Sequence, residues 1–122
     1  MRAAARPPGE EDLSGRVVIV TGASRGIGKG LAIGLAAAGA SVVCAARTVE
    51  EDPAGLPGTI HATVDAIRST GGEATPVQCD IGIEDDIERL VATTVDVYGR
   101  IDVLMNNAMA PTRGLFVARN KV

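Results

Sequence analysis

The residues best suited to chemistry lie between Thr21 and Gly28, which read TGASRGIG and follow the apolar run 17–20. Glycines let an anion approach the backbone closely, and the N-terminus of a following helix favours negative charge. The stretch predicts a phosphate-binding turn, with an ordinary tight turn of an α/β protein as the alternative. A nucleoside-triphosphate P-loop is excluded, because five residues instead of four separate Gly22 from the Gly28–Lys29 pair, and Gly30 replaces the required hydroxyl.

Elements that could hold this turn alternate regularly along the chain. Apolar runs and helical periodicity, bounded by glycines, predict strands at about 16–20, 41–46, 73–79 and 101–106, and helices at about 25–38, 59–70 and 84–98. Strands separated by helices imply right-handed crossovers and a parallel sheet. The predicted fold class is α/β: an incomplete, Rossmann-type doubly wound parallel sheet with strand order 3-2-1-4.

The predicted helices each have a recognisable apolar face. In the first helix we expect the inward side chains to be Ile27, Leu31, Leu35 and Ala38. In the third helix an apolar stripe comprises Ile87, Leu90, Val91, Thr94 and Val95, and acids occupy the first turn, where the helix dipole favours them. Thr59 is the predicted N-cap of the second helix.

Two polar motifs converge in this fold. The carboxyl ends of the first and fourth strands lie at the point where the strand order reverses, which is where doubly wound sheets bind ligands. Thr21–Gly22 ends the first strand and Asn106–Asn107 ends the fourth. We therefore expect both motifs at one crevice.

The glycine turn, Asp80 after the third strand and Asn106-Asn107-Ala108 after the fourth resemble the motifs of the short-chain dehydrogenase/reductase family. The resemblance spans about residues 13–116 and departs from the family pattern at Met109, where the family has glycine. It implies that Asp80 binds the adenine amino group of a dinucleotide and that the Asn-Asn-Ala motif lines the cofactor site. The candidate cofactor-binding residues are Thr21, Gly22, Ser24, Arg25, Gly26, Ile27, Gly28, Arg47, Asp80, Ile81, Asn107 and Ala108.

The charge after the second strand bears on the choice of cofactor. An NAD site places a carboxylate there to bind the ribose hydroxyls, but this chain reads Ala45-Ala46-Arg47. Arg47 and Arg25 could pair with the additional phosphate of NADP. NADP(H) is therefore the predicted cofactor and NAD(H) a possible one, the alternative being two solvated arginines.

The resemblance implies hydride transfer between the nicotinamide and an alcohol or ketone, with a Tyr-x-x-x-Lys pair and a serine as catalytic residues. The only tyrosine, Tyr98, has Asp102 four positions later, where the motif needs lysine. Lys121 has Val117 four positions earlier, where the motif needs tyrosine. We predict no catalytic residue in this chain, which would be a truncated, cofactor-binding part of an oxidoreductase. A non-catalytic nucleotide-binding or interaction fragment is the alternative, associating with itself or a partner through the exposed edge of the fourth strand.

Composition narrows the remaining possibilities. The net charge of −3 argues against nucleic acid as a partner, and no run is long enough to cross a membrane. Cys44 and Cys79 have the spacing of neither a disulfide framework nor a metal site, and His61 has no cluster of ligands around it. No metal site is predicted, and a cytoplasmic location is expected. We expect a disordered leader at 1–13, a dinucleotide-binding part at 14–110 and an irregular end at 111–122.

Overall fold

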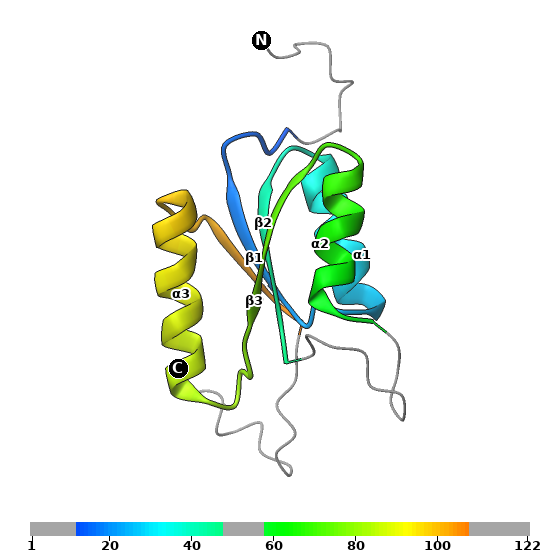
Figure 1. Ribbon diagram of the computed structural model, residues 1–122. Helices are drawn as coiled ribbons and strands as arrows, with labels where there is room; N and C mark the ends of the chain where they lie inside the picture. Colours follow the sequence, from blue (N-terminus) through cyan, green and yellow to red (C-terminus); the bar gives the residue numbers. More distant parts are fainter. Residues whose placement is uncertain (1–11, 48–57, 108–122) are drawn as a thin grey trace.

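The computed structural model describes residues 12–47 and 58–107, which form a parallel sheet with helices on both faces (Figure 1). The elements are β1 (Val17–Thr21), α1 (Gly26–Ala37), β2 (Ser41–Ala46), α2 (Ile60–Ser69), β3 (Glu73–Gln78), α3 (Glu84–Tyr98) and β4 (Val103–Asn106). The strand order is β3-β2-β1-β4, and every neighbouring pair is parallel. The predicted fold class and strand order are thus confirmed.

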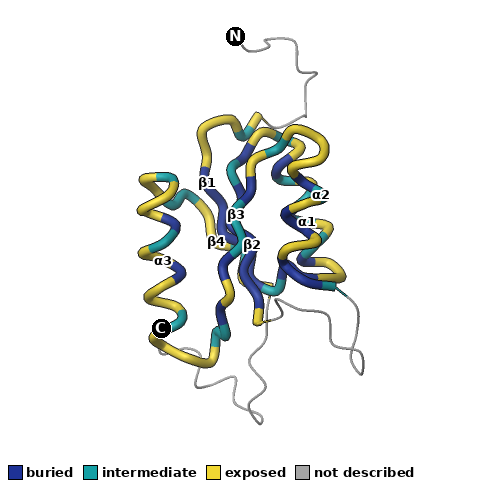
Figure 2. The backbone as a smooth tube through the Cα atoms, viewed as in Figure 1, coloured by how far each residue is buried: buried dark blue, intermediate teal, exposed yellow. Residues whose placement is uncertain are grey.

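The sheet separates two apolar cores. Helices α1 and α2 cover one face and α3 lies on the other (Figure 1). Alternate residues of β1 serve the two sides, Val18 and Val20 packing toward α1 and α2, and Ile19 toward α3. All of β1, and β2 from Val42 onward, are buried (Figure 2). Burial on both faces explains why these strands read as continuous apolar runs.

The predicted inward face of α1 is only partly correct: Leu35 packs against the core beneath α1, but the buried positions are different ones. Its buried residues are Gly28, Ala32 and Ala36, whereas Ile27 is 77% exposed. Small residues at every fourth position bring the helix axis close to the sheet, and this close approach turns the larger side chains toward the flanks. A prediction based on large apolar side chains therefore misplaced the buried face of α1, which is formed by small residues.

Helix α3 buries only part of its predicted stripe. Leu90 and Thr94 are buried, but Ile87, Val91 and Val95 are exposed (Figure 2). The helix packs mainly against β2 and β3, and β4 beside it is largely exposed. Accordingly Leu104, which pairs in register with Ile19, is 56% exposed.

Capping residues set several element boundaries as predicted. The Thr59 hydroxyl accepts a hydrogen bond from the N–H of Ala62 at 3.1 Å, as an N-cap does. Gly99 ends α3 with a φ of +83°, a left-handed conformation that glycine adopts without strain. The acids Glu84, Asp85 and Asp86 occupy the first turn of α3. Strand β4 begins two residues later than predicted, at Val103.

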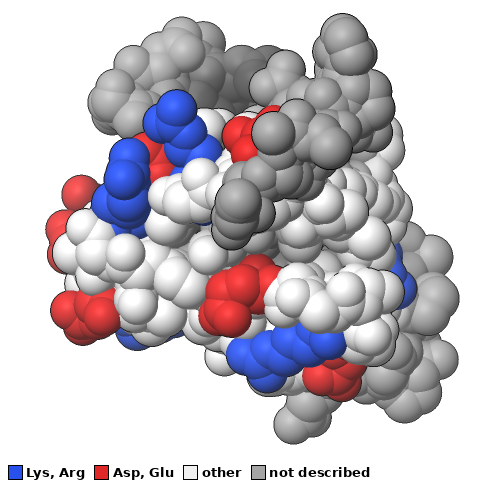
Figure 3. Space-filling view, turned by 90° about the horizontal axis from the view of Figure 1, so that it is seen from above, with Lys and Arg blue, Asp and Glu red and all other residues white. Residues whose placement is uncertain are grey.

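The amino end of the sheet is closed by hydrogen bonds and ion pairs. One Asp102 oxygen accepts from the N–H of Val17 at 2.8 Å, and the other accepts from Arg100 at 2.6 Å. These contacts, the Arg100 side chain above all, hold the pKa of Asp102 below its usual value. Viewed from this end, basic groups lie beside acidic ones (Figure 3).

Tyr98 is also held at the amino end. Its hydroxyl lies 2.7 Å from Thr75 Oγ1 and 2.9 Å from Glu73 Oε2, which fastens the end of α3 to the start of β3. Burial, with a further contribution from Glu73, raises the pKa of Tyr98 to about 12. The prediction that Tyr98 serves as the end of a helix agrees with this placement.

Some predictions fall beyond the described residues. These are the leader up to residue 11, residues 48–57 of the loop after β2, and positions from Ala108 onward, including the expected irregular end. Leu13, which we placed in the leader, donates its N–H to Ala38 O at 2.8 Å and packs on the α1–α2 core. The folded part therefore includes Leu13. No described helix is long and apolar enough to cross a membrane.

Candidate cofactor site

The glycine turn combines one crowded glycine with one open glycine. At Gly28 a Cβ would overlap the carbonyl oxygen of Gly22 and lie 2.7 Å from Asn107 Nδ2, so only glycine lets the helix begin there. Gly26 has a φ of +61°, and a Cβ at this position would meet nothing within 4 Å. The first feature fixes the helix against β1, and the second leaves room in front of the backbone for a ligand.

The first turn of α1 carries no acidic residue and no side-chain cap: the N-cap residue, Arg25, makes no side-chain cap hydrogen bond. By contrast, Thr59 caps α2, and acids fill the first turn of α3. The uncapped N–H groups and the helix dipole make this terminus suitable for a phosphate.

Neighbouring elements hold the turn in place. The N–H of Ala23 donates to Ala45 O of β2 at 3.1 Å. The fully buried hydroxyl of Thr63 in α2 donates to Ala23 O at 2.7 Å. Ser24 is 5% exposed, so its side chain belongs to this packed turn. Sequence reasoning missed Thr63, since a threonine within a helix carries no signal of a distant backbone partner.

The ends of β1 and β4 are joined directly, so the two polar motifs do converge. The Thr21 hydroxyl accepts from the N–H of Asn107 at 3.0 Å and lies 3.2 Å from Asn106 Oδ1. Asn107 Nδ2 is 3.4 Å from Gly22 O. The asparagines therefore fix the switch point of the sheet beside the glycine turn.

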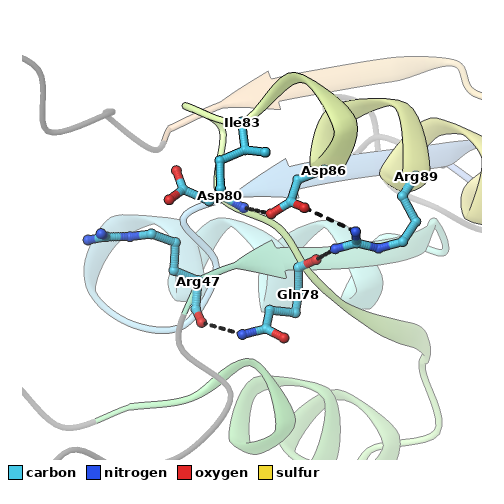
Figure 4. A pocket seen from close by; sticks show the side chains of 6 residues that line it. All are labelled: Arg47, Gln78, Asp80, Ile83, Asp86 and Arg89. Carbon is cyan, nitrogen blue, oxygen red and sulfur yellow. Dashed lines mark hydrogen bonds and ion pairs between the residues drawn. The ribbon is translucent and has the colours of Figure 1, made fainter.

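A pocket of about 620 Å³ lies at the carboxyl ends of β2 and β3, in front of the first turns of α3. Its lining residues are Arg47, Gln78, Asp80, Ile83, Asp86 and Arg89 (Figure 4). The Asp80 carboxylate and the Arg47 guanidinium point to the same side of this pocket. A side-chain hydrogen bond from Gln78 Nε2 to Arg47 O, 3.2 Å long, ties the two strand ends together.

The charges in the pocket are partly paired. Asp86 accepts the N–H of Asp80 at 2.9 Å and forms an ion pair of 3.0 Å with Arg89. The bond from Asp80, assisted by Arg89, holds the pKa of Asp86 below its usual value. Burial and the nearby Asp86 charge raise the pKa of the Cys79 thiol, and burial raises that of Cys44 to about 12. Both cysteines are thus neutral core residues at physiological pH.

The predicted site residues separate into two groups. Thr21, Gly22, Ser24, Arg25, Gly26, Ile27, Gly28 and Asn107 surround the glycine turn, whereas Arg47 and Asp80 line the pocket. Ile81 packs against the core between the sheet and α3, and Ile83 lines the pocket in its stead. Ala108 lies outside the described residues.

Sequence reasoning also missed Gln78, Asp86 and Arg89. The spacing of Asp86 and Arg89, three residues apart at the start of a helix, signals that they share a face. The sequence pattern identifies the acids only as partners of the helix dipole. Among the described residues, no group of histidine, cysteine or acidic side chains could hold a metal ion.

A doubly wound parallel sheet with an anion-accepting glycine turn at its switch point defines a dinucleotide-binding protein of Rossmann type. More closely, the chain belongs to the short-chain dehydrogenase family, whose model matches residues 16–120. It is thus a member of an NAD(P)-binding oxidoreductase family.

The comparisons with known proteins agree on this family. The chain is 46% identical over 103 residues to hydroxysteroid dehydrogenase-like protein 2 of Xenopus tropicalis and 42% identical to that of Homo sapiens. These matches cover 84% of this chain but 24% of each relative, so the chain spans about a quarter of their length.

Solved structures give the same result. A metagenomic short-chain oxidoreductase in complex with NADP superimposes with a TM-score of 0.72 at 40% identity, over 85% of this chain and 43% of that one. A hydroxysteroid dehydrogenase from Escherichia coli does so with a TM-score of 0.72 at 33% identity, over 89% and 44%.

Proposed function

We propose that this chain binds NADP(H), with the pyrophosphate on the glycine turn and the adenosine end in the pocket. The observation that carries the choice of cofactor is Arg47, which follows β2 where an NAD site has a carboxylate, and which lines the pocket. A guanidinium offers a 2′-phosphate a planar fork of donors, and an acid at this position would repel it.

The two groups of site residues supply complementary contacts. Open space at Gly26 and the uncapped start of α1 suit the pyrophosphate, for which backbone N–H groups are the donors. Arg25 lies at the same helix terminus and is exposed, so its side chain is available to the adenosine phosphate. Asp80 would receive the adenine amino group.

The oxidoreductase as a whole would transfer hydride between NADP(H) and an alcohol or ketone. The bound nicotinamide would carry the hydride. The described residues bind and orient the dinucleotide, and the one tyrosine of the sequence lies at the opposite end of the sheet, bonded to Thr75 and Glu73. We infer that this chain alone contributes cofactor binding rather than turnover.

A second candidate function, association through the β4 edge, rests on exposed apolar residues. Val103 and Leu104 are 43% and 56% exposed on an edge strand of the described sheet. Such an edge offers unpaired backbone groups to another strand. Light scattering is expected to detect association that Leu104→Lys abolishes, and a monomeric chain at all concentrations would rule this function out.

Isothermal titration calorimetry with NADPH and NADH tests the primary proposal. NADPH should bind at least about tenfold more tightly, because a hydrogen bond to a charged group contributes about 1.5–3 kcal/mol. Arg47→Ala should reduce NADPH affinity toward that of NADH, with Arg25 retaining part of the preference, and should leave NADH affinity unchanged. Arg16→Ala removes the same charge at the amino end and should alter neither. Equal affinities in the folded parent chain would refute the preference for NADP(H).

A further inference from the structure

The turn between β3 and α3 is fastened by a chain of hydrogen bonds at the wall of the pocket (Figure 4). The N–H of Asp80 donates to one oxygen of Asp86 at 2.9 Å. The other oxygen of Asp86 accepts from Arg89 Nη1 at 3.0 Å, and Arg89 Nη2 donates to Gln78 O at 2.7 Å. The backbone on both sides of Cys79 is thus held by one acid and one arginine of α3.

Asp80 is constrained on its other side as well. Its Oδ1 accepts from the N–H of Gly82 at 2.9 Å, which orients the carboxylate plane. The backbone bond to Asp86 and the side-chain bond to Gly82 together leave the carboxylate little rotational freedom. An acceptor that is fixed before the ligand arrives loses little entropy on binding.

Asp86 differs from its neighbours in the same helical turn. It is half-buried and bonded to both Asp80 and Arg89, whereas Glu84 and Asp85 are exposed. Its contacts exceed what interaction with the helix dipole requires, because they reach out of the helix to the end of β3. Arg89 also balances the charge of Asp86, which would otherwise add to that of Asp80 inside the pocket.

We infer that Asp86, clamped by Arg89, is a positioning residue that aims the Asp80 carboxylate at the adenine amino group. The inference rests on the proposed function, since it concerns the adenosine end of the same dinucleotide. Asp86 does not touch the ligand in this account. Its effect on binding is confined to the contact that Asp80 makes.

A cofactor analogue isolates that contact. Replacing adenine by unsubstituted purine in NADPH exchanges the amino group for a hydrogen atom and leaves the ring nitrogens, the phosphates and the nicotinamide unchanged. The ratio of the dissociation constants of analogue and NADPH therefore reports the Asp80 contact. A general loss of structure weakens both ligands and leaves the ratio unchanged.

Calorimetry of the complete chain with both ligands is the experiment, with Asp85→Ala as the matched control. The parent chain and Asp85→Ala should favour NADPH by about tenfold, the scale of a hydrogen bond to a charged group. In Asp86→Ala the ratio should fall close to 1, while the nicotinamide and phosphate contacts still permit binding. Arg89→Met, which removes the clamp but retains the acid, should lower the ratio in the same direction.

The possible results distinguish failure of this inference from failure of the proposed function. If the ratio stays near that of the parent chain in folded Asp86→Ala, the positioning role is overturned and cofactor binding is left intact. If Asp86→Ala does not fold, the same result in Arg89→Met decides the question. A parent chain that binds NADPH without discriminating against the analogue also overturns it, because Asp80 then makes no such contact. A folded parent chain that binds neither NADPH nor NADH overturns both.

Discussion

At the amino end of the sheet, charged side chains bond to one another and to the backbone, whereas the carboxyl end presents uncapped amides and an exposed arginine. Asp102 takes its bonds from Arg100 and Val17, and Tyr98 lies between Thr75 and Glu73. At the other end, α1 starts without a side-chain cap, and Arg47 is exposed at a pocket. One end is closed by the protein, and the other is left available for a ligand.

This difference separates stability from binding. Groups at the amino end are satisfied within the fold, so their loss should weaken the fold and leave ligand affinity unchanged. In the proposed function, groups at the carboxyl end bind the ligand, and some of them also pack against the sheet. Gly28 and Thr63 pack in this way, and we expect their substitution to affect both properties.

Gly28→Val should have the largest effect. The added side chain would overlap Gly22 O, a backbone atom that cannot move aside, so we expect a loss of about 3 kcal/mol or more in the free energy of unfolding. Urea denaturation measures it. Gly30→Ala is the control: it meets nothing within 4 Å in the same helix and should stabilise the chain by up to about 1 kcal/mol. Equal stability of Gly28→Val and the parent chain would contradict the close packing.

Thr63→Val should cost about 1–3 kcal/mol, because it leaves the buried Ala23 O without the bond from Thr63. NADPH affinity should fall as well, since Ala23 belongs to the glycine turn. Thr94→Val is the matched control on the α3 side, where the hydroxyl bonds to Leu90 O within its own helix. An unchanged NADPH affinity in Thr63→Val would show that the turn does not depend on α2.

Tyr98 offers a spectroscopic test of the amino end, because the chain has one tyrosine and no tryptophan. Its absorbance should titrate with a pKa of about 12 in the folded chain and near 10.0 in urea. Because folding raises this pKa, the stability from the neutral phenol is complete below pH 10 and is lost as the pH rises toward 12. A folded-state midpoint near 10.0 would mean that the hydroxyl is free in solvent.

Asp102→Asn should have the smallest effect, a modest loss of stability at neutral pH that disappears in acid. The pKa of Asp102 lies below its ordinary value of 3.8, so its contribution to stability is present above pH 3.8 and is lost as the pH falls through the lowered pKa. The melting temperature of the parent chain should therefore fall more steeply below pH 4 than that of the variant. NADPH affinity at neutral pH should be the same in both.

The sequence predicted the fold well because its strongest signals are local. Apolar runs, glycines after helices and the Thr59 cap each report a neighbouring stretch of chain. The inward face of α1 was misjudged in part because close packing favours Ala32 and Ala36 over the larger Leu31 and Ile27. Small residues carry little signal in a pattern based on hydrophobicity.

The site was predicted in outline for a related reason. Motifs at strand ends identified the glycine turn, Asp80 and Asn107, since the topology fixes where strand ends meet. The residues that support them from elsewhere, such as Thr63 and Asp86, contact the backbone of distant segments. That kind of contact depends on register and helix rotation, which the sequence pattern does not specify.

The most direct test of the central claim is amide chemical-shift mapping of the ¹⁵N-labelled chain as NADPH is added. A pyrophosphate held by the glycine turn should give its largest shifts at the amides of Ser24 to Ile27, with further shifts at Arg47 and Asp80 and none at Val17 or Asp102. Saturating shifts elsewhere, with the amides of the turn unchanged in a folded chain, would contradict the account.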